Sequence, residues 1–248
     1  MCVLEGPDLV RAALDAEVEF EAVFVDGAQQ ASGAFAGILR DAEAKGVRVF
    51  ALAKGVLATV ADAQTPQPVL ATVRLPLVEL SAIRAEGLIF VLHDVRDPGN
   101  AGTIVRSADA AGASAVVFSG QSVDPFNPKT LRASAGSVFH VPVCVDDLAV
   151  AIAHFSGEGA RVLATVVRGG ASHRTQDLVV PTVIVIGNEA TGLDDEAVSL
   201  CDASITIPMQ GAAESLNAAI AASLIAFEAL YQRQDRSSAP SPRSLEGS

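Results

Sequence analysis

The chain has 248 residues, half of them hydrophobic and 19% charged, which is enough to bury a sizeable core in one large or two small domains. Its formal net charge of −12 argues against a protein that coats nucleic acid nonspecifically, although a few placed arginines can still form a local basic site. No apolar run reaches the roughly 18–20 residues of a membrane span, and the first residues lack the basic-then-apolar pattern of a secretory signal.

The first part of the chain alternates between helical and strand patterns, which is typical of a small α/β unit. Residues 6–16, 32–46 and 54–63 are predicted helices, with Gly46 ending the second, and residues 20–27, 47–52 and 65–76 are predicted strands. Residues 75–87 form a connector with a boundary near Ser81. We therefore expect a first domain at residues 1–80.

Short, nearly continuous apolar runs recur from Gly87 onward, separated by helical or glycine-rich segments. This alternation predicts a buried, largely parallel sheet with helices on both faces. The runs are residues 88–95, 114–120, 139–145, 161–167, 182–189 and 204–209. We expect the second domain at residues 81–233 and a disordered, Pro/Ser-rich tail at residues 234–248.

The last predicted helix, residues 216–232, is expected to be amphipathic and to pack on the core. Its predicted buried stripe is Leu216, Ile220, Ser223, Phe227 and Leu230.

Three predicted strands end in loops that combine glycine with Asn, Glu or Ser. These loops read "RDPGNAG", "NEATGL" and "QGAAESLN". Each alone could be an ordinary turn or helix cap, with Ser215 as an N-cap in the third. Because ligands of open parallel sheets bind beyond the carboxyl ends of the strands, three such loops together predict a site on one rim.

Arg106 follows the first of these loops in the stretch "NAGTIVRSADAAGA". If a helix starts near Thr103, Ile104, Ala108 and Ala111 form its buried stripe, Arg106 lies opposite, and Gly112 ends it. A lone arginine there is most simply a solvated side chain. Arginine carries most of the positive charge of this chain, however, and its planar fork suits phosphate.

Lys129 and Arg132 lie in "NPKTLRASAGS", which is either an Ala-rich helix with a solvated basic face or a second phosphate contact.

No pair of histidines has metal-ligand spacing, so we predict no metal site. Neither a P-loop nor a dinucleotide-binding G-x-G-x-x-G follows a predicted strand. The three cysteines, Cys2, Cys144 and Cys201, are scattered along the sequence. This spacing indicates small buried thiols and a reducing, cytoplasmic environment.

Three stretches of the sequence together resemble the motifs of a known family. "DPGNAGTIVRSADAAGA", "VIVIGNEATGL" and "IPMQGAAESLNAAIAASL" resemble, in order and spacing, the three motifs of the SpoU/TrmH family of S-adenosylmethionine-dependent RNA ribose 2′-O-methyltransferases, and the likeness covers about residues 88–232. It implies a parallel-sheet SPOUT domain with a C-terminal trefoil knot, and a homodimer with its active site near the subunit interface. Residues 1–80 resemble the L30e-type RNA-binding extension of members that modify ribosomal RNA.

The resemblance also implies roles for individual residues. Catalytic roles fall to Asn100, Arg106, Glu189, Ser215 and Asn217. Contacts with S-adenosylmethionine fall to Gly187, Ile207, Met209, Ser215, Leu216 and Asn217. RNA contacts fall to Arg106, Lys129 and Arg132. Ala190 replaces a glycine that is frequent in the second motif, so the backbone there is expected to have an ordinary φ.

The function that this resemblance implies is methyl transfer from S-adenosylmethionine to a ribose 2′-hydroxyl of RNA. The L30e-like half favours 23S ribosomal RNA and the thiostrepton-resistance branch over transfer RNA. A transfer RNA methyltransferase, and a non-enzymatic RNA-binding protein that keeps the fold, are the alternatives. Neither a membrane nor a metal ion is expected among the partners.

Overall fold

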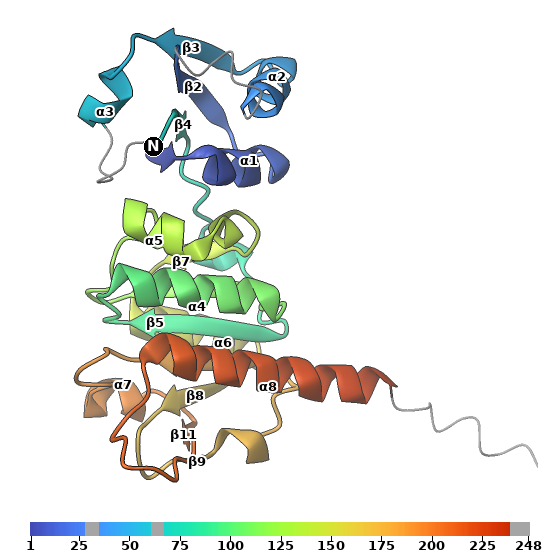
Figure 1. Ribbon diagram of the computed structural model, residues 1–248. Helices are drawn as coiled ribbons and strands as arrows, with labels where there is room; N and C mark the ends of the chain where they lie inside the picture. Colours follow the sequence, from blue (N-terminus) through green and yellow to red (C-terminus); the bar gives the residue numbers. More distant parts are fainter. Residues whose placement is uncertain (28–34, 61–66, 239–248) are drawn as a thin grey trace, which may run out of the picture.

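The computed structural model describes residues 1–27, 35–60 and 67–238. These residues form two α/β units, each built on its own sheet (Figure 1). The predicted α/β class is therefore confirmed. None of the helices in the described ranges combines the length and the apolar character needed to cross a bilayer.

The first unit contains a four-stranded sheet in the order β1-β4-β2-β3. β4 is antiparallel to both β1 and β2, whereas β2 and β3 are parallel. The sequence patterns missed β1, which has only four residues. Parts of two predicted helices, residues 32–34 and 61–63, lie outside the described residues. The elements are β1 (Cys2–Glu5), α1 (Pro7–Asp15), β2 (Phe20–Asp26), α2 (Ala36–Ala44), β3 (Arg48–Leu52), α3 (Val56–Val60) and β4 (Val69–Val73).

The second unit contains a seven-stranded sheet in the order β7-β6-β5-β10-β8-β11-β9. Every neighbouring pair of these strands is parallel, as predicted. The two-residue strand β9 was not predicted. The trefoil knot stays a prediction. The elements are η1 (Leu80–Ala82), β5 (Leu88–His93), α4 (Pro98–Ala110), β6 (Ala115–Ser119), α5 (Pro128–Ser134), η2 (Ser137–Phe139), β7 (Val143–Val145), α6 (Leu148–Gly157), β8 (Arg161–Thr165), β9 (Ala171–Ser172), η3 (His173–Thr175), β10 (Thr182–Ile186), α7 (Asp195–Ser199), β11 (Ala203–Thr206) and α8 (Ala218–Ser238).

Helices cover both faces of this sheet, as the apolar runs predict. Alternate residues of β5 point to opposite faces. Phe90 belongs to the core that includes α4, α5 and α8, whereas Ile89 and Val91 belong to the core formed with α6. A strand buried on both faces explains why β5 reads as an unbroken apolar run.

Helix α4 starts at Pro98, five residues before the predicted start at Thr103. Asp97 caps it by accepting a hydrogen bond from the Asn100 amide at 2.7 Å, and Pro98 occupies the first turn. Its buried face includes Ile104, Ala108 and Ala111, as predicted. Gly112 follows with φ 68°, which suits a helix-ending glycine.

Helix α8 corrects the predicted stripe. It begins at Ala218 and extends through Ser238, into the segment predicted as tail, while residues 239–248 lie outside the described residues. Its buried face is mostly alanine, because small residues let α8 approach α4 closely; the Ser107 and Ser223 hydroxyls of the two helices are 2.7 Å apart. Of the predicted buried residues, Ile220 is 53% exposed and Phe227 37% exposed. The residues that are buried are Ala218, Ala219, Ala222, Ile225, Ala226 and Ala229.

The two units contact each other through α5 and the start of the chain. Arg132 of α5 forms an ion pair with Glu5 of β1 at 3.1 Å, and the Glu5 side chain is only 5% exposed. Gly136 faces Ala12 so closely that a Cβ at position 136 would lie 2.5 Å from the Ala12 Cβ. The first unit is therefore packed against the second as well as tethered to it.

The three free cysteines behave as packing residues. Burial raises the pKa of the Cys2, Cys144 and Cys201 thiols to about 11. At neutral pH these thiols are protonated, and protonated thiols are poor nucleophiles. The prediction of small buried thiols holds for Cys2 and Cys144, while Cys201 is partly exposed.

The contact between α4 and α5 generates a stability prediction. A Cβ at Gly102 would meet the Thr130 carbonyl and lie 2.5 Å from the Ala133 Cβ, whereas a Cβ at Gly157 of α6 meets nothing within 4 Å. Gly102→Ala should lower the free energy of unfolding by about 1–3 kcal/mol through overpacking. Gly157→Ala, the matched helical control, should be neutral or stabilise by up to about 1 kcal/mol. Urea unfolding measures both, and equal stability of the two variants would contradict the close helix contact.

Candidate functional site

The three predicted loops meet at the carboxyl edge of the large sheet. Glu189, after β10, accepts hydrogen bonds from the Asn100 side-chain amide at 3.1 Å and from the Asp97 backbone amide at 3.2 Å. Asn217, before α8, donates its side-chain amide to the Asn100 Oδ1 at 2.7 Å. A chain of side chains, Glu189–Asn100–Asn217, therefore joins the loops that follow β5, β10 and β11.

The loop after β10 is shaped by Asn188. Its Oδ1 accepts hydrogen bonds from the Ala190 and Thr191 amides at 2.9 and 3.2 Å, and its Nδ2 donates to the Asp94 carbonyl at 2.9 Å. The Asn188 and Gly192 backbones also exchange two hydrogen bonds. This tight turn holds Glu189 against the start of α4.

Ala190 has the ordinary φ that its side chain requires. Among the described residues other than glycine, only Glu17, Asp94 and Ala135 have positive φ. The replacement of the frequent motif glycine is therefore compatible with the turn.

The cap of α8 corrects a second expectation. Asn217, rather than Ser215, is the capping residue: its Oδ1 accepts hydrogen bonds from the Ala219 and Ile220 amides at 2.9 and 3.2 Å, and its carbonyl accepts from Ala221. Ser215 is exposed and lies two residues earlier in the loop. One asparagine thus starts α8 and also contacts Asn100.

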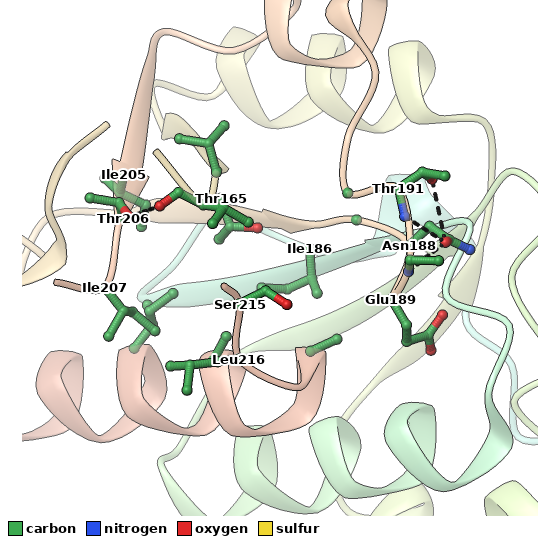
Figure 2. Close-up of a pocket in the computed structure, with 18 of the residues that line it drawn as sticks. Thr165, Ile186, Asn188, Glu189, Thr191, Ile205, Thr206, Ile207, Ser215 and Leu216 are labelled. Atoms are coloured by element: carbon green, nitrogen blue, oxygen red, sulfur yellow. Dashed lines mark hydrogen bonds between the residues drawn. The ribbon is translucent and has the colours of Figure 1, made fainter. Parts of the chain in front are cut away.

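A cavity of about 180 Å³ lies beside this network, between the strand ends and α8. In Figure 2, Ser215 lies between Thr165 and Thr206 on one side and Asn188 and Glu189 on the other, and Leu216 lies below them. Of the six residues predicted to contact a cofactor, five line this cavity; the sixth, Asn217, does not line it and is linked through Asn100 to Glu189, which does. Those five are Gly187, Ile207, Met209, Ser215 and Leu216.

Gly187 is required by the backbone that crosses it. A Cβ there would lie 2.5 Å from the Gly192 carbonyl carbon and the Leu193 nitrogen. Because glycine has no Cβ, the turn between Asn188 and Gly192 can pack against Gly187 at the floor of the cavity.

Part of the cavity lining was missed at the sequence level. The end of β8 contributes Thr165, Val166 and Val167, and α8 contributes Ala221 and Ile225. The segment "TVVRGG" after β8 lacks the Asn, Glu or Ser that marked the other loops. Its only signal was its place at the end of a parallel strand.

Arg106 lies on the exposed side of α4, away from the buried stripe, as the periodicity predicts. Within the described chain its side chain forms no ion pair or hydrogen bond. Its guanidinium is therefore available to a ligand approaching from solvent.

Lys129 and Arg132 differ in their surroundings. Lys129 is exposed in the first turn of α5, where its backbone amide bonds to Asn127. Arg132 is engaged by Glu5 of the first unit. No cluster of three or more His, Cys, Asp or Glu side chains suited to a metal ion occurs among the described residues.

Comparisons with known proteins agree with this geometry. Residues 87–227 match the model of the SpoU rRNA Methylase family, and residues 3–77 match the model for RNA 2′-O ribose methyltransferase substrate binding. The chain belongs to the SpoU rRNA methylase family.

Its relatives include two enzymes named for 23S ribosomal RNA. The chain is 34% identical over 182 residues to the 23S rRNA (guanosine(2553)-2′-O)-methyltransferase RlmP of Bacillus subtilis, covering 73% of this chain and 72% of that one. It is 37% identical over 188 residues to the 23S rRNA (uridine(2479)-2′-O)-methyltransferase of Streptomyces viridochromogenes, covering 72% and 65%.

A solved structure resembles nearly the whole chain. The SpoU methyltransferase AviRb from Streptomyces viridochromogenes, in complex with the cofactor AdoMet, superposes with a TM-score of 0.83 at 30% identity. The match covers 94% of this chain and 90% of that one.

Two substitutions at Asn217 separate its role as the cap of α8 from its contact with Asn100. Asn217→Asp keeps an oxygen for the α8 amides but loses the donor to Asn100, whereas Asn217→Ala loses both. Thermal unfolding should show a loss of about 1 kcal/mol for Asn217→Ala and a much smaller loss for Asn217→Asp. Equal destabilisation by the two substitutions would contradict the capping role.

Proposed function

We propose that the chain transfers a methyl group from S-adenosylmethionine to a ribose 2′-hydroxyl of 23S ribosomal RNA. The observation that carries this proposal is the cavity under α8, bordered by the Glu189–Asn100–Asn217 network and close along α4 to the unpaired Arg106. The two relatives named for 23S rRNA support this substrate over transfer RNA.

The cavity fits the proposed cofactor. Ile186, Ile205 and Ile225 give it apolar walls suited to a flat adenine ring, and Thr206 and Ser215 add hydroxyls. Residues 208–216 form no hydrogen bond between backbone groups within the described chain, so their amides and carbonyls are free to meet the polar edges of a ligand. When bound, S-adenosylmethionine supplies an activated methyl group with its own leaving group.

The surrounding residues would position the RNA and manage one proton. A guanidinium keeps its proton in proteins and is a poor base, so Arg106 grips a phosphate of the target nucleotide, and the 2′-hydroxyl proton passes to that phosphate or to solvent. Asn100 and Glu189 hold the start of α4, and thereby Arg106, in register with the cavity. Ser215 and Leu216 close the cavity from the α8 side.

The same proposal includes the roles of the two domains and of the basic residues of α5. Residues 1–80 act as the substrate-binding domain and residues 81–233 as the transfer domain. Lys129 contacts an RNA phosphate, and Arg132 contributes less because Glu5 already holds its guanidinium. The reaction would take place in the cytoplasm and need no metal ion.

A homodimer is also proposed, and α8 supports it. Four large apolar residues follow one another along α8 at helical spacing and remain 37–60% exposed: Ile220, Leu224, Phe227 and Tyr231. A contiguous apolar stripe on a surface helix is typical of a protein interface. Because α8 also closes the cavity, a second subunit there would lie near the site.

Arg106→Ala tests the catalytic assignment. Methyl transfer to rRNA should fall at least about 100-fold, because transition-state positioning is lost. The affinity for S-adenosylmethionine should stay within about twofold, since Arg106 does not line the cavity. Arg161→Ala, at the opposite edge of the sheet, is the matched control and should keep wild-type transfer. Normal transfer by Arg106→Ala would remove Arg106 from the site.

Leu224→Glu tests the dimer. A charge buried in an apolar interface costs several kcal/mol, so the dimer dissociation constant should rise at least about 100-fold. Val150→Glu, on the exposed side of α6, is the control and should leave the mass unchanged. Sedimentation velocity measures both. A wild-type chain that sediments as a monomer at micromolar concentration would end the dimer proposal.

A further inference from the structure

The sheet of the first unit carries an exposed aromatic pair with an arginine beside it. Phe50 of β3 is 42% exposed and stacks on Phe24 of β2, with ring centroids 5.6 Å apart and an interplanar angle of 20°. The Arg48 guanidinium carbon lies 5.9 Å from the centre of the Phe50 ring. We call Arg48, Phe24 and Phe50 the β3 platform.

The register of the strands explains why these groups meet. Phe24 and Phe50 are direct partners in the parallel pair of β2 and β3. Arg48 lies two residues before Phe50 and therefore on the same face. Val23 and Val25, which point the other way, are fully buried in the main core. The platform thus lies on the face of the sheet turned away from that core.

Neither packing nor charge pairing accounts for the platform. Phe50 sits on an edge strand, where a large exposed ring gains little from burial. Within the described chain Arg48 forms no ion pair, although the protein carries twelve more negative than positive charges. A partly exposed ring beside an unpaired guanidinium is suited to stacking a planar ligand.

The segment of the sequence that contains β3 carries a net charge opposite to that of the whole chain. Residues 45–60 contain Lys45, Arg48 and Lys54 and no acidic residue, and two of the three lysines of the protein lie in this segment. Glu17, Glu19 and Glu21 line the groove at the Arg48 end of the strand.

We infer that the β3 platform stacks an unpaired base of the RNA substrate and so holds that RNA for methyl transfer. This inference rests on the proposed function. Bases splayed from RNA loops commonly stack on aromatic rings and on arginine planes. The same residues belong to the segment that matches the substrate-binding model. Because stacking rather than phosphate contact dominates, binding through this face depends only weakly on salt.

Three substitutions at position 50 separate stacking from other roles. The full-length variants Phe50→Ala, Phe50→Leu and Phe50→Tyr are compared in methylation of a 23S rRNA transcript. Phe50→Ala and Phe50→Leu should raise the KM for RNA by about 5- to 100-fold, the usual effect of losing one base–aromatic stack. Phe50→Tyr should stay within about threefold of wild type. The kcat and the KM for S-adenosylmethionine should be unchanged in all three.

A direct binding measurement separates this inference from the proposed function. Fluorescence anisotropy of the labelled 23S rRNA transcript, without cofactor, reports RNA affinity even if no transfer occurs. Wild-type binding without transfer would reject the function and leave the platform open to the same three variants. Arg48→Ala should weaken binding by about 2- to 5-fold, and Val145→Ala, exposed in the other unit, should not change it.

Several results overturn the platform. Wild-type RNA affinity in Phe50→Ala shows that the face does not bind RNA. Wild-type affinity in Phe50→Leu shows an apolar contact without stacking. A change of sedimenting mass in Phe50→Ala shows that a second copy of the chain covers the face. A fall in thermal stability that matches the loss of binding across the variants shows a purely structural role.

Discussion

The carboxylate of Glu189 is the group on which the arrangement of the site depends. It receives the side-chain amide of Asn100 and the backbone amides of Arg96 and Asp97, all near the first turn of α4. Hydrogen bonds from amides to a carboxylate are stronger than those between neutral groups. Through Asn100 the same network reaches Asn217, the cap of α8. Without Glu189, the start of α4 would lose three hydrogen bonds to the loop after β10, and Asn100 would keep only its contact with Asn217.

This constraint connects folding to the proposed chemistry. Arg106 lies six residues beyond Asn100, about 9 Å farther along the axis of α4. Fixing the start of α4 therefore fixes the position from which the guanidinium would meet the proposed substrate. Asn217 links the same fixed point to the helix that closes the cavity. The proposed cofactor pocket and the proposed RNA contact are held by one set of hydrogen bonds.

Much of this could be predicted from sequence because buried parallel strands leave a strong pattern. The run at β5 is apolar from Leu88 to Leu92, and the polar loops after β5, β10 and β11 lie where a parallel sheet binds ligands. The start of α4 was misplaced because Gly99 and Gly102 lower helix propensity, although Asp97 and Pro98 mark the true start. The strands β1 and β9 are too short to show a pattern.

The error at α8 has a different physical origin. A stripe drawn through the largest apolar residues assumes that they are buried, whereas α8 packs through alanines that allow close approach to α4. The large residues remain on the outside, where a partner subunit is proposed. The β8 part of the cavity was missed because "TVVRGG" carries none of the polar side chains that marked the other loops. The ion pair of Arg132 could not be predicted, because its partner, Glu5, lies 127 residues earlier in the sequence.

The acidity of the chain limits how it can hold RNA. With a net charge of −12, broad phosphate attraction is weak, and we propose that placed groups such as Arg106, Lys129 and the β3 platform supply the affinity. Such a surface would favour recognition of RNA shape and unpaired bases over binding of any RNA.

The central claim, methyl transfer to a ribose 2′-hydroxyl of 23S ribosomal RNA, is tested most directly by nucleoside mapping. The purified chain is incubated with total RNA and S-adenosylmethionine carrying a labelled methyl group, and the RNA is then digested and its nucleosides separated. The account predicts that the label appears in a 2′-O-methylated nucleoside of 23S rRNA. Label on a base, label in transfer RNA, or no incorporation despite cofactor binding would contradict it.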